Sequence, residues 1–225
     1  MFKLNNCLVL YSNLIITSIM DFNEKQIEIL LVAEQLFAEE GFDGTSVREI
    51  AKIANINVAM ISYYFGSKEK LLESLVLYRI SDMQLQLESL STEDISPIEK
   101  IDKLIQFYIN RINSNRCMYQ ILHFEVSTKK REINLDAFTQ VKKNNLKLVE
   151  NIIVEGQQKG LFKSNITIPL IPTIIIGSLT HFHTNKYYYE DILELDSDEK
   201  YENYISNELT KHIQKTIKAL LTYED

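Results

Sequence analysis

Glycine and proline are scarce in this sequence, and their scarcity limits the possible folds more than any other feature. Six glycines and three prolines occur in 225 residues, about 4% of the chain against roughly 12% in an average protein. Because these residues interrupt helices and build tight turns, their rarity favours long helices over a β-sandwich with many turns. Contents of 45% hydrophobic and 24% charged residues exclude a disordered chain. The sequence therefore predicts an all-α fold with an ordinary buried core.

Charge and cysteine content exclude several classes of protein. The formal net charge of −7 argues against a generally basic, histone-like protein and against one held on membranes by lysines. An anionic partner must therefore bind at a local basic patch. Cys7 and Cys117 have no Cys or His neighbour at a metal-binding spacing and form no disulfide framework, which is typical of a reducing compartment. We expect a cytoplasmic protein without a metal or cofactor.

The first 20 residues contain an apolar run, at positions 7–19, that has some features of an export signal. The run is too short to cross a bilayer, a Ser-Asn pair interrupts it, and no small-residue cleavage site follows. We interpret Met20 as the start of translation, because the residues after it open an ordinary helix. A genuine N-terminal arm is the alternative. No membrane partner is expected in either case.

Two helices are predicted before residue 55, separated by a glycine. The first covers 24–40 and ends at Gly41; the second begins with a capping box in which Ser46 caps the helix and Glu49 reaches back. Each has one apolar face with the spacing of a helix. These faces consist of Leu30, Ala33, Leu36 and Phe37 in the first helix, and of Val47, Ile50, Ala51 and Ala54 in the second.

A sharp turn and a third short helix follow. Asn55 stands at the turn, where asparagine tolerates the left-handed conformation, and Asn57 can cap a helix over 58–65. This helix buries Ile61 and Phe65 and leaves polar, aromatic and small groups outside. Gly66 then ends it, and residue 67 caps a long helix to about residue 89. Two short helices joined by a tight turn are typical of a helix-turn-helix, although many other helical hairpins share this pattern.

The whole string from Gly41 to Leu72, GFDGTSVREIAKIANINVAMISYYFGSKEKLL, closely resembles the DNA-binding segment of the tetracycline-repressor-like (TetR) family of bacterial transcriptional regulators. The resemblance is continuous from about Lys25 to Leu75. It departs from the family at Asn55, where glycine is common, and at Ser62, where many members carry tyrosine. It implies a homodimeric, ligand-responsive repressor of a palindromic operator, with residues 21–70 as the DNA-binding domain and 71–225 as a helical ligand-binding and dimerisation domain.

Several residues of this segment are candidates for contact with double-stranded DNA. Ser46 exposes helix N-terminal amides to phosphate, and Arg48 can bind phosphate or a guanine edge. Small and apolar side chains at the start of the third helix can contact thymine methyl groups, and its hydroxyl groups can bind base edges or the backbone. The complete predicted set is Ser46, Arg48, Val58, Ala59, Met60, Ser62, Tyr63, Tyr64 and Lys68.

The charge of this segment is modest. Residues 44–70 hold four basic and two acidic side chains, so one copy can neutralise only a few phosphates and would bind DNA weakly. Two copies bound to a two-fold symmetric DNA site would double the number of phosphate contacts and so bind more tightly. Lys70 is explained equally well as a phosphate contact and as a solvated lysine.

Further helices are predicted over 96–113, 117–128, 133–159, 167–186 and 201–222. The first begins with a capping box from Ser96 to Glu99, and the third ends at Gly160. The segment 167–186 is apolar on nearly every side, which indicates burial, and we expect a subunit interface there. The resemblance implies that the last two helices pair with their copies as a four-helix bundle.

The resemblance also implies a small-molecule effector, whose identity the sequence does not reveal. Aromatic and histidine side chains of the C-terminal part can line a pocket or simply fill the core. They are Phe107, Tyr108, Tyr119, His123, Phe124, Phe138, His181 and Phe182. His181 and His183 are two residues apart on a helix and so cannot chelate one metal ion. Asp196 and Asp198 lack the glycine and distal glutamate of a calcium loop.

Two alternatives to a ligand-responsive repressor remain. The same DNA-binding segment could serve a regulator or organiser controlled by a protein partner, with a filled C-terminal core. An all-α enzyme is the third hypothesis, but the sequence has no metal cluster, no phosphate-binding glycine loop and no recognisable pair of nucleophile and base.

Overall fold

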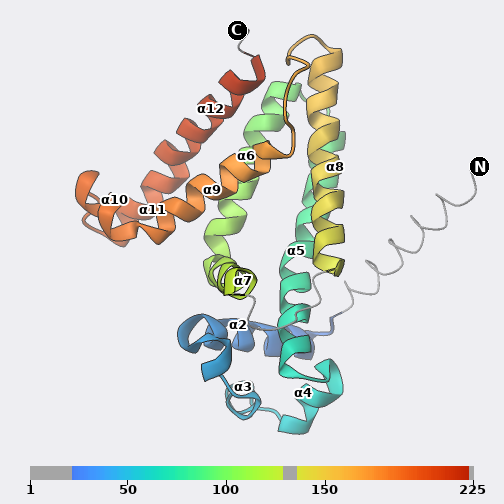
Figure 1. Cartoon of the computed structure of the whole chain (residues 1–225), viewed down its shortest axis with the longest axis vertical. Coiled ribbons are helices and arrows are strands. Elements are labelled where there is room, and N and C mark those ends of the chain that lie inside the picture. The colour runs from blue at the N-terminus through green and yellow to red at the C-terminus, as the bar shows by residue number, and fades with distance from the viewer. Residues whose placement is uncertain (1–21, 129–135, 223–225) are drawn as a thin grey trace, which may run out of the picture. The chain divides into compact units, whose positions relative to one another are not determined.

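The computed structural model describes residues 22–128 and 136–222, apart from the side chains at positions 81, 82, 85, 123, 126 and 128. Helices make up the regular structure of these residues (Figure 1), in agreement with the predicted all-α fold. The expected N-terminal extension and Cys7 lie outside the described residues. None of the helices in the described ranges combines the length and the apolarity needed to cross a membrane.

The helices are α2 (Glu24–Gly44), α3 (Val47–Ile53), α4 (Val58–Phe65), α5 (Lys68–Thr92), α6 (Pro97–Ser114), α7 (Arg116–Thr128), α8 (Asp136–Gln158), α9 (Leu170–Thr184), α10 (Lys186–Ile192), α11 (Asp198–Tyr204), a π-helical turn (Ile205–Leu209) and α12 (Thr210–Thr222).

The chain forms two compact units. The first unit comprises the described residues up to 85 together with those among 115–142, and the second comprises 86–114 and 143–222. The first unit is therefore larger than the predicted segment 21–70. The reason is that helix α7 packs against α2, so that Met118 and Ile121 join the same apolar cluster as Leu30, Phe37 and Ile61.

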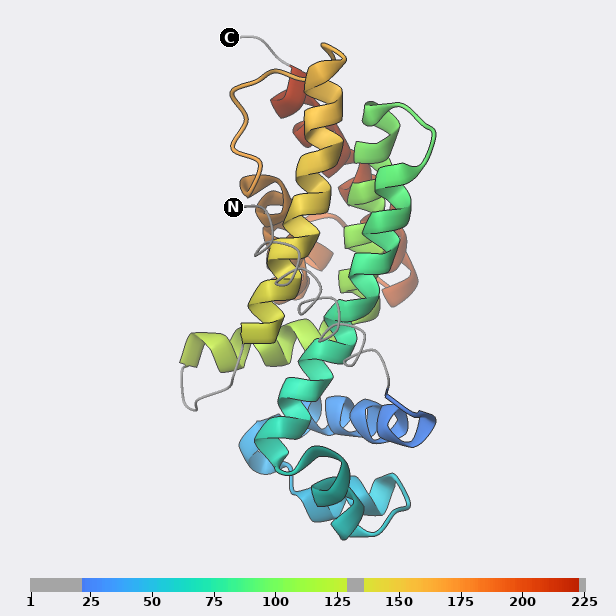
Figure 2. The ribbon, with the colours of Figure 1, turned by 90° about the vertical axis from the view of Figure 1, so that its right-hand side faces the viewer.

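In the first unit, α3 and α4 lie against each other and α5 follows α4 directly (Figure 2). The expected faces are buried: Phe37 is 2% exposed, Ile50 0% and Ile61 1%. The predicted break at Gly41 is confirmed, since its φ of 74° and ψ of 165° interrupt helical geometry within α2. Glu34 of α2 and Arg79 of α5 form an ion pair with little exposure to solvent, which holds α5 against α2.

The second unit is built around α6, α9 and α12, which pack against one another. The capping box predicted at Ser96 is confirmed: Glu99 N–H donates to the Ser96 hydroxyl oxygen at 3.2 Å, and Ser96 N–H donates to the Glu99 carboxylate at 3.0 Å. The Ser96 hydroxyl also donates to the Glu99 carboxylate, at 2.7 Å. This hydrogen bond and the one from the Ser96 N–H lower the pKa of the Glu99 carboxyl. The core includes Ile101, Leu104, Ile105 and Tyr108 of α6, Ile171, Ile175 and Leu179 of α9, and Ile213, Ile217 and Leu221 of α12.

The helix predicted over 167–186 has the wrong bounds at both ends. Helix α9 begins at Leu170 after Pro169, and it ends at Asn185, whose φ of −108° and ψ of 36° are not helical. The Asn185 side-chain amide donates to the carbonyl oxygen of His181 at 2.9 Å, so it caps the helix end. A separate helix, α10, then follows, and only its first residue was expected to be helical. Only one face of α9 is buried within the second unit.

The last predicted helix is also longer than expected. It begins at Asp198, because the Ser197 hydroxyl oxygen accepts a hydrogen bond from the Lys200 N–H. A π-helical turn over Ile205–Leu209 joins α11 to α12. The Ile205 carbonyl oxygen accepts from the Thr210 N–H and also from the Thr210 hydroxyl, at 2.8 Å for the hydroxyl.

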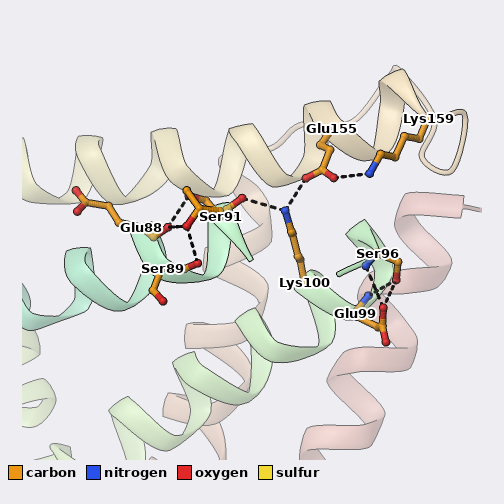
Figure 3. A network of polar contacts seen from close by, with 9 residues as sticks. Glu88, Ser89, Ser91, Ser96, Glu99, Lys100, Glu155 and Lys159 are labelled. Carbon is orange, nitrogen blue, oxygen red and sulfur yellow. Dashed lines mark hydrogen bonds and ion pairs between the residues drawn. The ribbon is translucent and has the colours of Figure 1, made fainter. Parts of the chain in front are cut away.

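A polar network fastens three helices of the second unit together (Figure 3). The Lys100 side chain of α6 is 5% exposed, and its ammonium group donates to the Ser91 carbonyl oxygen at 2.9 Å and to the Glu155 carboxylate at 2.8 Å. Lys159 binds the other oxygen of Glu155. Hydrogen bonds from Lys100 and then from Lys159 lower the pKa of Glu155. The network joins the C-terminal end of α5 to α6 and α8.

Candidate DNA-binding surface

The helix-turn-helix is assembled by local hydrogen bonds that the sequence predicted. The Ser46 hydroxyl oxygen accepts from Glu49 N–H at 3.2 Å and starts α3. Asn55 has a φ of 50°, the left-handed conformation expected at the turn. The Asn57 side-chain oxygen then accepts from Ala59 N–H at 2.9 Å and starts α4. Gly66 ends α4 with a φ of 84°.

Helix α4 has one buried face and one exposed face. Ile61 and Phe65 point into the core of the first unit, with 1% and 8% exposure. The tyrosine at position 63 is 82% exposed, the highest exposed fraction among the exposed large apolar and aromatic side chains that the structure describes in the first unit. An aromatic side chain held in solvent on a rigid helix is suited to contact with a nucleic acid. The other exposed residues of α4 are Val58, Ala59 and Ser62, while Met60 and Tyr64 are half-buried.

Tyr64 has a packing role besides any contact with DNA. Its ring packs against the apolar cluster of the first unit. It also meets the ring of Tyr63 edge to face, with centroids 5.2 Å apart.

Basic side chains accompany this surface on α3. Arg48 and Lys52 are both exposed and are four residues apart, so they lie on one face of the helix. The ammonium group of Lys70 lies 2.7 Å from the Glu73 carboxylate, which weakens it as a phosphate contact. Arg48 and Lys52 are therefore the cations of this surface best placed for an anionic backbone. Lys52 was not in the predicted set, although its position one turn after Arg48 was visible in the sequence.

Lys68 has a structural role that the sequence did not indicate. Its ammonium group donates to the carbonyl oxygens of Phe42 and Thr45, both at 2.7 Å, and lies 4.2 Å from the centre of the Phe42 ring. The Thr45 hydroxyl in turn donates to the carbonyl oxygens of Leu36 and Gly41. Lys68 thereby fixes the connection between α2 and α3, just before the capping residue Ser46. No local pattern relates residues that lie 23 and 26 positions apart.

The predicted effector residues are divided between the two units. Tyr119, Phe124 and Phe138 belong to the first unit, where Phe138 packs against the apolar cluster and Phe124 is 51% exposed. Phe107, Tyr108, His181 and Phe182 belong to the second unit. The side chain of His123 lies outside the described set.

Within the second unit these residues do not form one group. The Phe107 and Tyr108 rings lie 6.2 Å apart on α6, whereas His181 is exposed on α9. Phe182 is buried in a stack of rings with Tyr189 and Tyr204. Among the described residues, no three His, Cys, Asp or Glu side chains are arranged to hold a metal ion.

Comparisons with known proteins agree with this geometry. Residues 29–75 match the family of bacterial regulatory proteins called the tetR family, and residues 79–202 match the C-terminal region of YsiA-like proteins. The HTH-type transcriptional repressor NicS of Pseudomonas putida is 29% identical over 182 residues, which cover 76% of this chain and 82% of NicS. The probable HTH-type transcriptional regulator YttP of Bacillus subtilis is 32% identical over 145 residues, which cover 64% of this chain and 68% of YttP.

A solved structure shares the fold. The crystal structure of the transcriptional regulator FadR from Bacillus subtilis in complex with stearoyl-CoA has a TM-score of 0.62 to this chain at 21% identity. The alignment covers 88% of this chain and 99% of FadR. The two family matches together extend from α2 into α11, across both units. The chain therefore belongs to the tetR family of bacterial regulatory proteins, with α3 and α4 as its helix-turn-helix.

Proposed function

We propose that this protein is a ligand-responsive transcriptional repressor that binds a palindromic operator as a homodimer. The observation that carries the proposal is the exposed face of α4, on which Tyr63 is 82% exposed, together with the exposed cations Arg48 and Lys52 on the neighbouring helix α3. The similar protein NicS is a transcriptional repressor, which supports repression as the outcome of binding.

In this proposal α4 enters the major groove and reads base edges through Tyr63, Ser62 and the apolar residues at its start. The helix N-terminus at Ser46, with Arg48 and Lys52, contacts phosphates and sets the register. Since only a few cations accompany each α4, two copies are needed for firm binding. The dimer forms through α9 and the segment from α11 to α12.

The effector changes DNA affinity only by its differential binding to two arrangements of the dimer. An effector that binds better when the two recognition helices are wrongly spaced for successive major grooves releases the operator. The FadR structure with stearoyl-CoA makes that compound a sensible first probe. Phe107, half-buried beside Tyr108 on α6, is the predicted pocket residue to change first.

The test is binding of the purified protein to DNA from upstream of its own gene, compared with scrambled DNA of the same length across a salt series. We expect selective binding that stearoyl-CoA, or a related acyl-CoA, weakens in the wild type and weakens less in Phe107→Ala. Equal binding of the protein to upstream and scrambled DNA would contradict the proposal of a site-specific repressor. Selective binding that no metabolite alters would favour control by a protein partner.

A further inference from the structure

The exposed surface of α4 is formed by four side chains, Val58, Ala59, Ser62 and Tyr63. Val58 and Ser62 are four residues apart, and so are Ala59 and Tyr63, so the members of each pair are neighbours on the helix surface. The four side chains therefore form one continuous surface along the helix. This surface consists of methyl groups, one aromatic ring and the hydroxyl groups of Ser62 and Tyr63.

This surface lacks the chemical groups that identify most base pairs in the major groove. Arginine and lysine bind guanine, asparagine and glutamine bind adenine, and aspartate and glutamate accept a hydrogen bond from cytosine. None of these residue types occurs among the eight residues of α4. Hydroxyl groups can bind several kinds of base edge, so Ser62 and Tyr63 give little discrimination through hydrogen bonds alone.

The polar side chains next to α4 have other tasks. The Asn57 side-chain oxygen accepts from Ala59 N–H at 2.9 Å and caps the helix, whereas a bidentate contact with adenine would need this oxygen as its acceptor. Arg48 and Lys52 belong to α3, the helix that crosses the phosphate backbone in a motif of this kind. Discrimination between bases at α4 must therefore come from apolar contacts.

Only thymine presents an apolar group in the major groove, its C5 methyl group. The α4 surface has apolar area left to cover it, since Val58 is 37% exposed and Tyr63 82%. Burial of one methyl group changes an affinity about fourfold. Two such contacts in each half-site of a palindrome would together change the affinity about 250-fold, which is sufficient for a modest preference over random DNA.

We propose that α4 recognises its operator through thymine methyl groups, so that thymine occupies the positions of each half-site that face Val58, Ala59 and Tyr63. The proposal rests on the DNA binding of the proposed function and names the chemical group that is read. Uracil pairs as thymine does but lacks the methyl group, and 5-methylcytosine carries the methyl group with different hydrogen-bonding groups. These two bases separate recognition of the methyl group from recognition of base hydrogen bonds or DNA shape.

The test begins by selecting duplexes from a random-sequence library with the purified protein. Each invariant thymine of the selected half-site is then replaced by uracil, by cytosine or by 5-methylcytosine, and affinity is measured by fluorescence anisotropy. Uracil at a position that faces α4 should weaken binding about fourfold in one half-site and about fifteenfold in both. At the same position 5-methylcytosine should weaken binding less than cytosine does.

A variant of Val58 links this effect to α4. Val58→Thr replaces one methyl group by a hydroxyl group at nearly constant size, so it should weaken binding to the thymine duplex and reduce the loss caused by uracil at one position. Val154→Thr makes the same change at a 40% exposed valine of α8 and is the matched control, with no expected effect on either quantity. Circular dichroism would confirm that both variants are folded.

The outcomes separate this proposal from the proposed function. A library from which no sequence is enriched overturns the site-specific repressor and the methyl recognition together. Selected half-sites without an invariant thymine, or affinities that uracil does not change, overturn the methyl recognition and leave the repressor standing. A loss caused by uracil that Val58→Thr leaves unchanged at every position overturns the methyl contact of Val58.

Discussion

The ammonium group of Lys68 donates to two backbone carbonyl oxygens, and this geometry changes what a substitution there should do. Hydrogen bonds from a charged donor contribute about 1.5–3 kcal/mol each when they are shielded from solvent. Lys68→Met should therefore lower the free energy of unfolding by about 2 kcal/mol, besides any loss of DNA affinity. Urea denaturation measures the change. Lys52→Met, at an exposed lysine of α3, is the control and should change stability by less than about 0.5 kcal/mol. Equal stability of both variants would limit Lys68 to a role in DNA binding.

Tyr63 presents the opposite case, because it is 82% exposed and contributes little to the core. Tyr63→Ala should leave stability unchanged and weaken operator binding about tenfold or more, since a lost base contact costs about 1–3 kcal/mol. Fluorescence anisotropy with operator and random DNA would separate the two kinds of binding. Leu31→Ala, at a 43% exposed apolar side chain of α2, is the control. The same loss on both DNAs would assign Tyr63 to the phosphate backbone.

At the scale of elements, the end of α8 depends on a close approach between a glycine and a ring. A Cβ atom at Gly156 would lie 2.0 Å from the Phe162 ring, so Gly156→Ala forces this side chain to move. Overpacking of this kind costs about 1–3 kcal/mol, and thermal or urea denaturation would measure it. In a Phe162→Ala background the same change should cost almost nothing. An undiminished cost in that background would show that the ring is not the cause.

The network between α5, α6 and α8 predicts a dependence of stability on pH (Figure 3). Since the folded state lowers the pKa of Glu155 below its ordinary value of 4.5, its contribution is complete above that pH and is lost as the pH falls through the folded value. The wild type should be more stable than Glu155→Gln at pH 6, and the difference should shrink below pH 4.5. Unfolding by urea at several pH values measures this. A difference that stays constant between pH 6 and pH 3 would contradict the role of the carboxylate.

For the whole molecule, the small number of cations near α4 predicts how DNA binding responds to salt. If each copy neutralises about three phosphates, a dimer on a palindrome should show a slope near −5 in a plot of log affinity against log salt. DNA with one half-site should give roughly half that slope and much weaker binding. Anisotropy titrations between 50 and 200 mM salt would measure both. Identical slopes on the two DNAs would mean that a single copy makes all the contacts.

The local structure of the DNA-binding segment could be predicted because its signals lie within one or two helical turns. Gly41 and Gly66 end helices, Asn55 adopts the left-handed conformation, and Asn57 caps α4, as expected. Each outcome depends on the residue's own conformational preference and on amides two to four positions away. For the same reason the buried faces of α2, α4 and α6 could be read from their spacing.

Other features depend on residues that lie far apart in the chain, and only the tertiary structure decided them. The carbonyl partners of Lys68, the ion pair between Glu34 and Arg79, and the packing of α7 against α2 leave no periodic signal in any short window. Helix α10 likewise owes its place to the stacking of Tyr189 on Phe182. The sequence by itself determined most of the helices, several of their caps and the buried faces of α2, α4 and α6, because these follow from local hydrogen bonds and helix periodicity. The tertiary structure decided which side chains hold those helices together and which stay exposed, because these depend on contacts between distant segments.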